Sequence, residues 1–260
     1  MIQNWENKVV FLTGASSGIG EALAIALAEK GAILGLLARR EDLLKQLAEK
    51  CEQAGGQARV LACDVTDERG VTESVNKFQN EFGKIDILIC NAGIGGSAHA
   101  KNLTNELFRK VIDVNLMGAV YALTAVLPKM IEQNSGQLVA ISSLAGIRGL
   151  PMSASYSASK GAMTNFFESL RLDLLKTNIS VTIIQPGFIL TPLTAERKNK
   201  LPFLMKLEDA IPLFIKAIEK KKRFSAFPWQ LATIVRLGRL FPGWLYDKIA
   251  GNTNYREQKE

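Results

Sequence analysis

The sequence predicts an α/β protein built on a doubly wound parallel sheet of about seven strands, with helices on both faces. Short apolar runs of strand length alternate with longer helical patterns along the chain. A glycine-rich turn joins the first apolar run to the first helical pattern. No internal repeat or low-complexity linker interrupts the 260 residues. We therefore expect a single domain, 1–260, in which 193–260 form a substrate lid and C-terminal extension.

The first strand, 8–13, runs into a turn with the spacing Gly-x-x-x-Gly-x-Gly, and a helical pattern follows over 17–30. The glycines permit a tight turn and a close backbone approach to phosphate. The helix N-terminus offers unpaired N–H groups and the positive end of its dipole. Strand, turn and helix together predict a dinucleotide-binding unit, so the sheet is of the Rossmann type. The expected cofactor-binding residues here are Gly14, Ser16, Ser17, Gly18, Ile19 and Gly20.

The second strand, 31–38, is followed directly by Arg39 and Arg40. An acidic residue near this point would bind the ribose 2′-OH of NAD, but position 38 is Ala38 and the first acid is Glu41. A guanidinium instead suits the dianionic 2′-phosphate of NADP. NADP(H) is therefore preferred over NAD(H). The alternative is that the two arginines are a basic pair on the surface beside a helix.

The remaining strands are expected at 59–62, 85–90, 137–142, 179–184 and 224–229, with helices at 41–53, 67–82, 106–132 and 208–222. Ligands of such sheets bind at the carboxyl ends of the strands. Asp64 follows the third strand and either contacts the cofactor or caps the helix that starts near Asp67. The other candidates at strand ends are Val65, Asn91, Ala92, Gly93, Pro186, Gly187, Ile189 and Thr191.

Two polar positions stand out within the later helices. Asn115 lies in the middle of a long apolar helical pattern, although Asn is a poor helix-interior residue, so we expect a kink or a held water there. Tyr156 and Lys160 are four residues apart, which places them on one helix face. A cation beside a tyrosine favours the phenolate and lowers its pKa from roughly 10 toward the working range. Ser143, at a strand end, is placed to hydrogen-bond a substrate oxygen that Tyr156 protonates. The alternative is a pair of surface helix residues.

Four blocks occur in order: the glycine turn from Thr13 to Gly20, Asn91-Ala92-Gly93, Asn115, and Tyr156 to Lys160 with Ser143 upstream. Together they resemble the short-chain dehydrogenase/reductase family over about residues 5–192. The resemblance implies a proton chain through Asn115 and Lys160. It also implies a 2′-phosphate reader at Arg39 with help from Ser16, an adenine contact at Asp64 and a sheet contact at Asn91. The Ile189 backbone and the Thr191 hydroxyl would hold the carboxamide of the cofactor. Many relatives are homodimers or homotetramers.

The expected activity is therefore an NADP(H)-dependent oxidoreductase that interconverts a ketone (or aldehyde) and an alcohol, with Tyr156 as the acid and base. The apolar makeup of 94–102 and of the segment after Thr191 indicates a bulky lipophilic substrate. Two alternatives remain: an NAD-dependent alcohol dehydrogenase of the same family, and a non-catalytic dinucleotide-binding regulator. The complete set of Asn115, Ser143, Tyr156 and Lys160 speaks against the regulator, because binding alone requires neither Tyr156 nor Ser143.

Composition limits the other classes. Cys51, Cys63 and Cys90 are an odd number without metal-type spacing, so we expect reduced thiols and no metal. The first residues do not resemble a secretory signal. No uncharged apolar run reaches the ~18 residues of a membrane span. We expect a cytoplasmic protein. No nucleic-acid motif is recognised.

The net charge of +7 is concentrated at the end of the chain. Residues 1–195 hold 18 Lys and Arg against 18 Asp and Glu, whereas residues 196–260 hold 14 against 7. The last segment also carries 9 of the 19 aromatic residues. Either 200–250 is a helical lid over the substrate mouth with a solvated surface, or its outer face also makes a peripheral contact with an anionic membrane.

Overall fold

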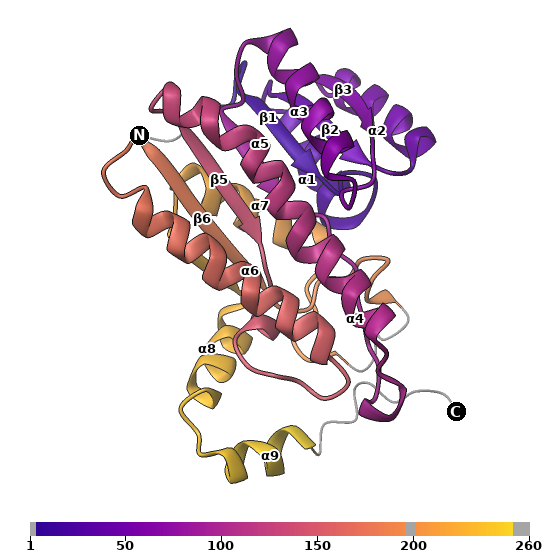
Figure 1. The fold of residues 1–260 in the computed structure, drawn as a ribbon, viewed down its shortest axis with the longest axis vertical. Coiled ribbons are helices and arrows are strands. Elements are labelled where there is room, and N and C mark those ends of the chain that lie inside the picture. Colours follow the sequence, from indigo (N-terminus) through magenta and orange to yellow (C-terminus); the bar gives the residue numbers. More distant parts are fainter. Residues whose placement is uncertain (1–3, 196–200, 252–260) are drawn as a thin grey trace.

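The computed structural model describes residues 4–195 and 201–251 (Figure 1). Seven parallel strands form one sheet in the order β3-β2-β1-β4-β5-β6-β7. This arrangement confirms the predicted doubly wound architecture. The chain builds the sheet outward in one direction from β1 to β3 and in the other direction from β4 to β7, so the strand order reverses between β1 and β4. The strands are β1 (Val9–Thr13), β2 (Ile33–Ala38), β3 (Gln57–Ala62), β4 (Ile87–Cys90), β5 (Gly136–Ile141), β6 (Ile179–Pro186) and β7 (Phe224–Phe227).

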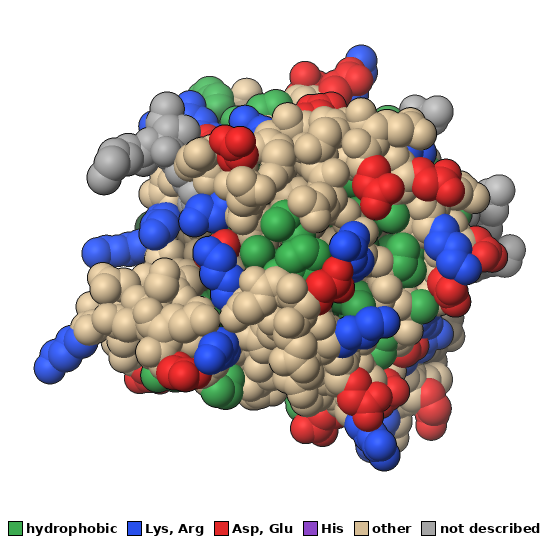
Figure 2. Space-filling view, turned by 90° about the horizontal axis from the view of Figure 1, so that it is seen from above, with side chains coloured by type: hydrophobic (Ala, Val, Ile, Leu, Met, Phe, Trp, Pro, Cys, Tyr) green, Lys and Arg blue, Asp and Glu red, His purple; other side chains and the backbone are tan. Residues whose placement is uncertain are grey.

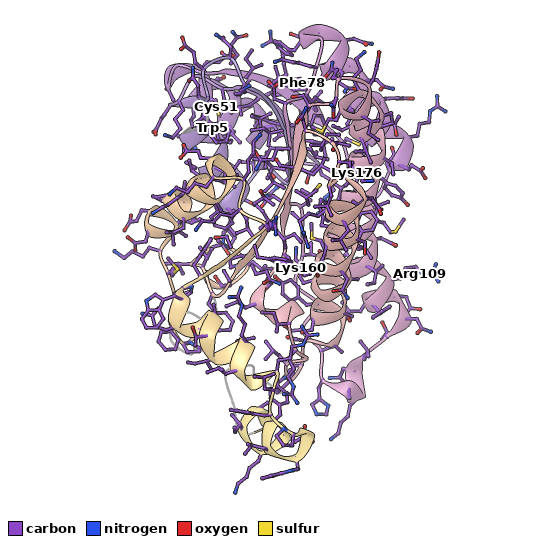
Figure 3. All side chains as sticks on the ribbon, turned by 90° about the vertical axis from the view of Figure 1, so that its left-hand side faces the viewer. Trp5, Cys51, Phe78, Arg109, Lys160 and Lys176 are labelled. Carbon is purple, nitrogen blue, oxygen red and sulfur yellow. The ribbon has the colours of Figure 1, made fainter. Side chains whose placement is uncertain are left out.

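Helices cover both faces of the sheet, as predicted. One face carries α1 (Gly18–Ala28), α2 (Glu41–Gln53) and α7 (Leu207–Glu219), whose buried residues form one core cluster with the sheet. The other face carries α3 (Glu68–Phe82), α5 (Gly118–Glu132) and α6 (Ala154–Asp173) over a second core cluster. Trp5 and Cys51 belong to the first cluster and Phe78 to the second (Figure 3). Because both faces are covered, β1, β4 and most of β5 and β6 are buried along their length.

The long helical pattern predicted over 106–132 is one continuous segment with a local change of winding. α4 (Asn105–Ile112) passes through a π-helical turn, Asp113–Met117, into α5. Asn115 lies in this turn and is fully buried. Such turns accommodate an extra residue within a helix and occur often at functional sites. The predicted irregularity at Asn115 is therefore present, and its form is a π-helical turn.

The same segment, Asn105–Glu132, is long and apolar enough to span a membrane by length and composition alone, with a mean hydropathy of 1.6. It packs on the sheet, however, and Ala119, Ala122, Leu123 and Val126 are buried in the core. An apolar helix in this position is what a covered parallel sheet requires. It is the only candidate span within 4–195 and 201–251.

The last part of the chain is divided between the two ends of the molecule. α8 (Trp229–Gly238) and α9 (Gly243–Gly251) lie at the carboxyl end of the sheet, at the bottom of Figure 1. The exposed basic run 220–223 precedes β7 and therefore lies at the opposite, amino end. Seen from that end, acidic and basic side chains are both present on the surface (Figure 2). The charge excess counted over 196–260 is thus not a single patch.

Candidate active site

The glycine turn brings the ends of β1 and β4 into close contact. Gly14 has φ +69°, and a Cβ there would lie 2.6 Å from the Ala92 Cα. A Cβ on Gly20 would collide with the Gly14 carbonyl oxygen. Both positions therefore require glycine for backbone packing. The turn leaves the first N–H groups of α1 facing a cleft that Gly14, Ser16, Ser17, Gly18 and Ile19 line.

Arg39 and Arg40 point to different partners. The Arg40 Nη2 donates to the Ser16 Oγ at 3.0 Å and to the Ser17 Oγ at 2.8 Å. Arg39 instead pairs with Asp64 at 3.4 Å. Both arginines line the cleft. The sequence argument linked Ser16 with Arg39, whereas in the structure Ser16 contacts Arg40.

Asp64 lies at the mouth of the same cleft. Its Oδ1 accepts from the Thr66 N at 3.0 Å and from the Thr66 Oγ1 at 2.9 Å. Partial burial acts to raise the pKa of Asp64, but the Thr66 hydrogen bonds and the Arg39 charge outweigh it and hold the pKa below its ordinary value. Asp67, not Asp64, caps α3 by accepting from the Gly70 N. The alternative role of Asp64 as a helix cap is therefore wrong.

Asn91 fastens the end of β4 to the end of β1. Its Nδ2 donates to the carbonyl oxygens of Thr13 at 3.1 Å and Gly14 at 3.0 Å. The backbone N–H groups of Asn91 and Ala92 both donate to the Thr13 Oγ1. These bonds fix the floor of the cleft between the glycine turn and Gly93, so an arrangement that steadies the sheet at this point is present.

Lys160 is an amine deep inside the molecule (Figure 3). Its side chain is 4% exposed, and its Nζ donates to the Ile141 carbonyl oxygen at 2.9 Å. Burial lowers the pKa of Lys160 from 10.5 to about 8, because desolvation disfavours the ammonium form. A Cβ on Gly93 would lie 3.4 Å from both the Lys160 Nζ and the Asn115 Oδ1. Two of the predicted catalytic residues therefore meet beside Gly93.

The Asn115 side chain makes three hydrogen bonds, two with Ile94 and one with Ser159. Its Oδ1 accepts from the Ile94 N at 2.8 Å, and its Nδ2 donates to the Ile94 carbonyl oxygen at 3.1 Å and to the Ser159 Oγ at 3.0 Å. The π-helical turn supplies the extra rotation that aims this side chain at the loop after β4. Asn115 thus ties the α4–α5 segment to α6, which carries Lys160, and to the loop that lines the cleft.

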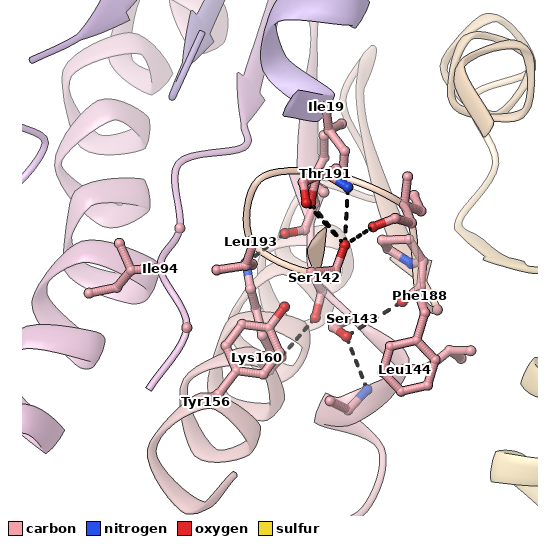
Figure 4. A pocket seen from close by; sticks show the side chains of 18 of the residues that line it. Ile19, Ile94, Ser142, Ser143, Leu144, Tyr156, Lys160, Phe188, Thr191 and Leu193 are labelled. Carbon is pink, nitrogen blue, oxygen red and sulfur yellow. Dashed lines mark hydrogen bonds between the residues drawn. The ribbon is translucent and has the colours of Figure 1, made fainter. Parts of the chain in front are cut away.

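Ser143 and Tyr156 complete the predicted group. The Ser143 Oγ accepts from the Ala145 N at 3.1 Å and donates to the Pro186 carbonyl oxygen at 3.4 Å. In Figure 4, Tyr156, Lys160 and Ser143 are grouped in the pocket, between Ile94 and Phe188. The neighbouring Ser142 also lines the cleft, but its hydroxyl donates to the Lys160 carbonyl oxygen at 2.9 Å. The Ser143 hydroxyl donates only to the more distant Pro186 carbonyl oxygen, so it is the more available of the two.

The cleft has a volume of about 720 Å³ and extends from the arginines to the C-terminal helices. Pro186, Gly187, Ile189 and Thr191, which were predicted to bind the cofactor, line it. The 189–194 loop is closed on itself, because the Thr194 Oγ1 donates to the Ile189 carbonyl oxygen at 2.5 Å. The inner side of α8 and α9 forms the distal wall. That wall contains Leu231, Ile234, Val235, Phe241, Tyr246 and Ile249.

Arg148 joins the C-terminal helices to the rest of the molecule, and sequence reasoning missed this contact. The Arg148 guanidinium stacks 3.7 Å from the Tyr246 ring centroid and donates to the carbonyl oxygens of Gly238 and Phe241. The Tyr246 hydroxyl donates to the Gly149 carbonyl oxygen at 2.5 Å. This contact ties α8 and α9 to the loop that follows Ser143. An isolated Arg in a loop gives no sequence signal for it, whereas the apolar spacing of Leu231 and Val235 does indicate a buried helix face.

Within the described part of the chain, no group of three or more His, Cys, Asp and Glu side chains is placed to hold a metal ion. All three cysteines carry free thiols. Burial raises the pKa of the Cys51 and Cys90 thiols to about 12, so these two remain protonated at neutral pH.

Both the sequence and the fold are similar to those of known dehydrogenases and oxidoreductases. The sequence profile described as "short chain dehydrogenase" matches residues 8–202. An "Uncharacterized oxidoreductase" of Myxococcus xanthus is 42% identical over 243 residues, covering 94% of this chain and 96% of the relative. An "Uncharacterized oxidoreductase" of Listeria innocua is 40% identical over 190 residues, covering 72% and 77%. The crystal structure of a short-chain type dehydrogenase/reductase from Mycobacterium marinum has a TM-score of 0.78 at 28% identity, covering 86% of this chain and 93% of that one.

Proposed function

The chain belongs to the short-chain dehydrogenase family, and we propose that it is an NADP(H)-dependent oxidoreductase that interconverts a ketone (or aldehyde) and an alcohol. The observation that carries the proposal is the cleft in which Ser143, Tyr156 and Lys160 face the dinucleotide-binding turn. A protein that only bound a dinucleotide would need neither the Tyr156 hydroxyl nor the Ser143 hydroxyl at this place. The family implies a nicotinamide cofactor, which supplies hydride when bound.

The residues present fit such a cofactor. The pyrophosphate would meet the α1 N-terminus and the backbone of 14–20, where the close packing of Gly14 and Gly20 keeps side chains out of the way. The ribose would lie near Lys160, and the loop with Ile189 and Thr191 would hold the carboxamide. Asp64 and Val65, both in the cleft wall, would contact the adenine side.

Preference for NADP(H) rests on the two arginines. A 2′-phosphate beside Ser16 would meet the Arg40 guanidinium, which already donates to the hydroxyls of Ser16 and Ser17. Arg39, exposed and only loosely paired with Asp64 at 3.4 Å, would supply a second positive charge. The position where an acidic residue would bind the 2′-OH of NAD is occupied by Ala38, and the two arginines follow it directly.

Each catalytic residue would then have one task. Tyr156 would protonate the substrate oxygen, and Ser143 would donate a hydrogen bond to it as its negative charge develops. The Lys160 ammonium would stabilise the tyrosinate that remains. Asn115, which fixes Ile94 and the Ser159 hydroxyl, would keep the route from Lys160 to solvent in order. These roles are reversible, so the same residues would serve oxidation of the alcohol.

The distal wall indicates the substrate class. It is made of branched aliphatic and aromatic side chains from α8 and α9 together with Leu150, Leu193 and Leu201. A cleft of about 720 Å³ must hold the nicotinamide end of the cofactor as well as the substrate. We therefore propose a bulky lipophilic ketone or alcohol.

We also propose that the protein is cytoplasmic and forms a homodimer or homotetramer. The outer sides of α4, α5 and α6 and the turn after α6 expose Phe108, Ile131, Leu172 and Leu175, each more than 40% accessible. Burying such apolar residues between copies would remove them from water. Sedimentation velocity measured over a range of protein concentrations tests this part of the proposal.

The activity is tested with a panel of small and bulky ketones, aldehydes and secondary alcohols. Each is assayed with NADPH, NADH and their oxidised forms. We expect turnover with NADPH and a bulky ketone, and much weaker turnover with NADH. Equal or better rates with NADH would assign the protein to the NAD-dependent alcohol dehydrogenases. Binding of NADPH without turnover of any carbonyl compound would favour a dinucleotide-binding regulator instead.

A further inference from the structure

The surface of α8 and α9 is unlike the rest of the molecule. Seven of its large apolar side chains are exposed, between 39% and 79%. They make up half of the fourteen exposed large hydrophobic residues found in the described part of the chain. Soluble surfaces rarely gather so many in one place without a partner. The seven lie in α8, α9 and the turn between them, and they are Trp229, Ile234, Leu237, Leu240, Phe241, Trp244 and Ile249. Ile234, Phe241 and Ile249 also line the cleft, which leaves Trp229, Leu237, Leu240 and Trp244 on the outer side alone.

The two sides of α8 have separate partners. Leu231, Val235 and Gly238 follow one another at helical spacing and line the cleft. Trp229, Arg236, Leu237 and Leu240 share the opposite, exposed side. The inner side therefore belongs to the site, and the outer side requires a different explanation.

Charge identifies the kind of partner. Among 229–251 the basic residues are Arg236, Arg239 and Lys248, and the only acid is Asp247, which leaves a net charge of +2 from three positive and one negative group. All four are exposed. A symmetric contact with a second copy would place this positive patch against itself. An anionic surface would instead be attracted to the patch.

We infer that the outer side of α8 and α9 docks on an anionic membrane surface. Trp229 and Trp244 have the amphipathic rings that prefer the membrane interface, and Leu237 and Leu240 supply the apolar area that inserts. The arginines between them suit acidic headgroups. The exposed basic run 220–223 lies at the other end of the sheet and takes no part.

This position has a consequence for the site. Because the same two helices form the distal wall of the cleft, docking would bring the apolar end of the cleft next to the lipid. Entry of a lipophilic substrate from the bilayer would follow, and this last step rests on the proposed function. Docking itself does not, so it is measured without cofactor or substrate.

Tryptophan fluorescence gives a direct test. The chain has three tryptophans, of which Trp5 is 3% exposed whereas Trp229 and Trp244 are each 71% exposed. The full-length protein is titrated with vesicles of phosphatidylcholine alone or with about one third phosphatidylglycerol, at low and raised salt. We expect a blue shift only with the acidic vesicles, weakened by salt. Trp229→Phe and Trp244→Phe should each reduce the shift, because Trp5 remains inside the fold.

Matched variants separate this surface from general stickiness. Arg236→Gln with Arg239→Gln should weaken binding to the acidic vesicles by about thirtyfold, whereas Lys220→Gln with Lys221→Gln should leave it unchanged. Leu240→Ser should weaken binding, and Leu103→Ser, which alters an exposed leucine elsewhere on the surface, should not. Thermal unfolding confirms that each variant is folded.

Three results would overturn the inference. One is the absence of binding to acidic vesicles at low salt. Another is binding that the Arg236 and Arg239 variants share with the wild type. The third is self-association that Leu240→Ser abolishes, with no vesicle binding, which would show a second copy of the chain to be the occupant.

Discussion

Replacing Lys160 with Met should stabilise the protein near neutral pH while it removes activity. The pKa of Lys160 falls from 10.5 to about 8 because burial disfavours the ammonium. A pKa lowered that far corresponds to about 3 kcal/mol of folded-state stability that is lost when the lysine is charged. The hydrogen bond to the Ile141 carbonyl oxygen returns about 1 kcal/mol. A methionine removes both terms, so Lys160→Met should gain about 2 kcal/mol at pH 7.

The sign of the pH dependence follows from the same shift. Between pH 8 and 10.5 the unfolded chain binds more protons at this lysine than the folded protein does, so the stability of the wild type rises with pH there. The burial cost is fully present below about pH 8 and falls to less than about half of that at pH 9.5. The advantage of Lys160→Met over the wild type should therefore shrink across this window.

Urea unfolding of the cofactor-free protein at pH 7 and 9.5 measures both quantities. Lys176→Met is the control, because Lys176 is an exposed lysine whose loss should change stability by less than about 0.5 kcal/mol. A Lys160→Met variant that is less stable than the wild type, or whose advantage does not change with pH, would refute the assignment of a buried, destabilising ammonium.

Two further predictions concern cofactor binding. Arg40→Ala should weaken NADPH binding about ten- to hundredfold and leave NADH nearly unchanged, because only NADPH carries the 2′-phosphate. Arg39→Ala should have the same preference but a smaller effect, and equal losses for both cofactors in isothermal titration would defeat the assignment. Gly20→Ala should abolish binding of either cofactor and lower the melting temperature, since its Cβ meets the Gly14 carbonyl oxygen. Gly243→Ala, with no atom within 4 Å of the added Cβ, should do neither.

Much of the fold could be predicted because each local pattern agreed with its neighbours. The apolar run before Gly14, the glycine turn and the helix after it each favour the same strand-turn-helix unit. Asn115 could be singled out for the opposite reason, as a polar residue that its local apolar pattern does not explain. The structure gives that residue a π-helical turn and three hydrogen bonds.

What could not be predicted depends on directions in space. Arg39 and Arg40 are adjacent in sequence, and only the backbone after β2 decides that Arg40 meets Ser16 while Arg39 meets Asp64. The excess of positive charge in the last quarter of the chain suggests a single basic surface. In the structure, β7 separates the run 220–223 from Arg236 and Arg239 by the length of a strand. A count along the chain contains no information on such a separation.

The central claim, that Tyr156 supplies the proton in a ketone–alcohol interconversion, is tested most directly with Tyr156→Phe. This variant keeps the ring and removes only the hydroxyl that would transfer the proton. NADPH affinity, measured by fluorescence titration, should stay within about threefold of the wild type. Turnover of the best carbonyl substrate should fall by about a hundredfold or more, the usual contribution of a general acid. Turnover at the wild-type rate, with NADPH still bound, would contradict the account.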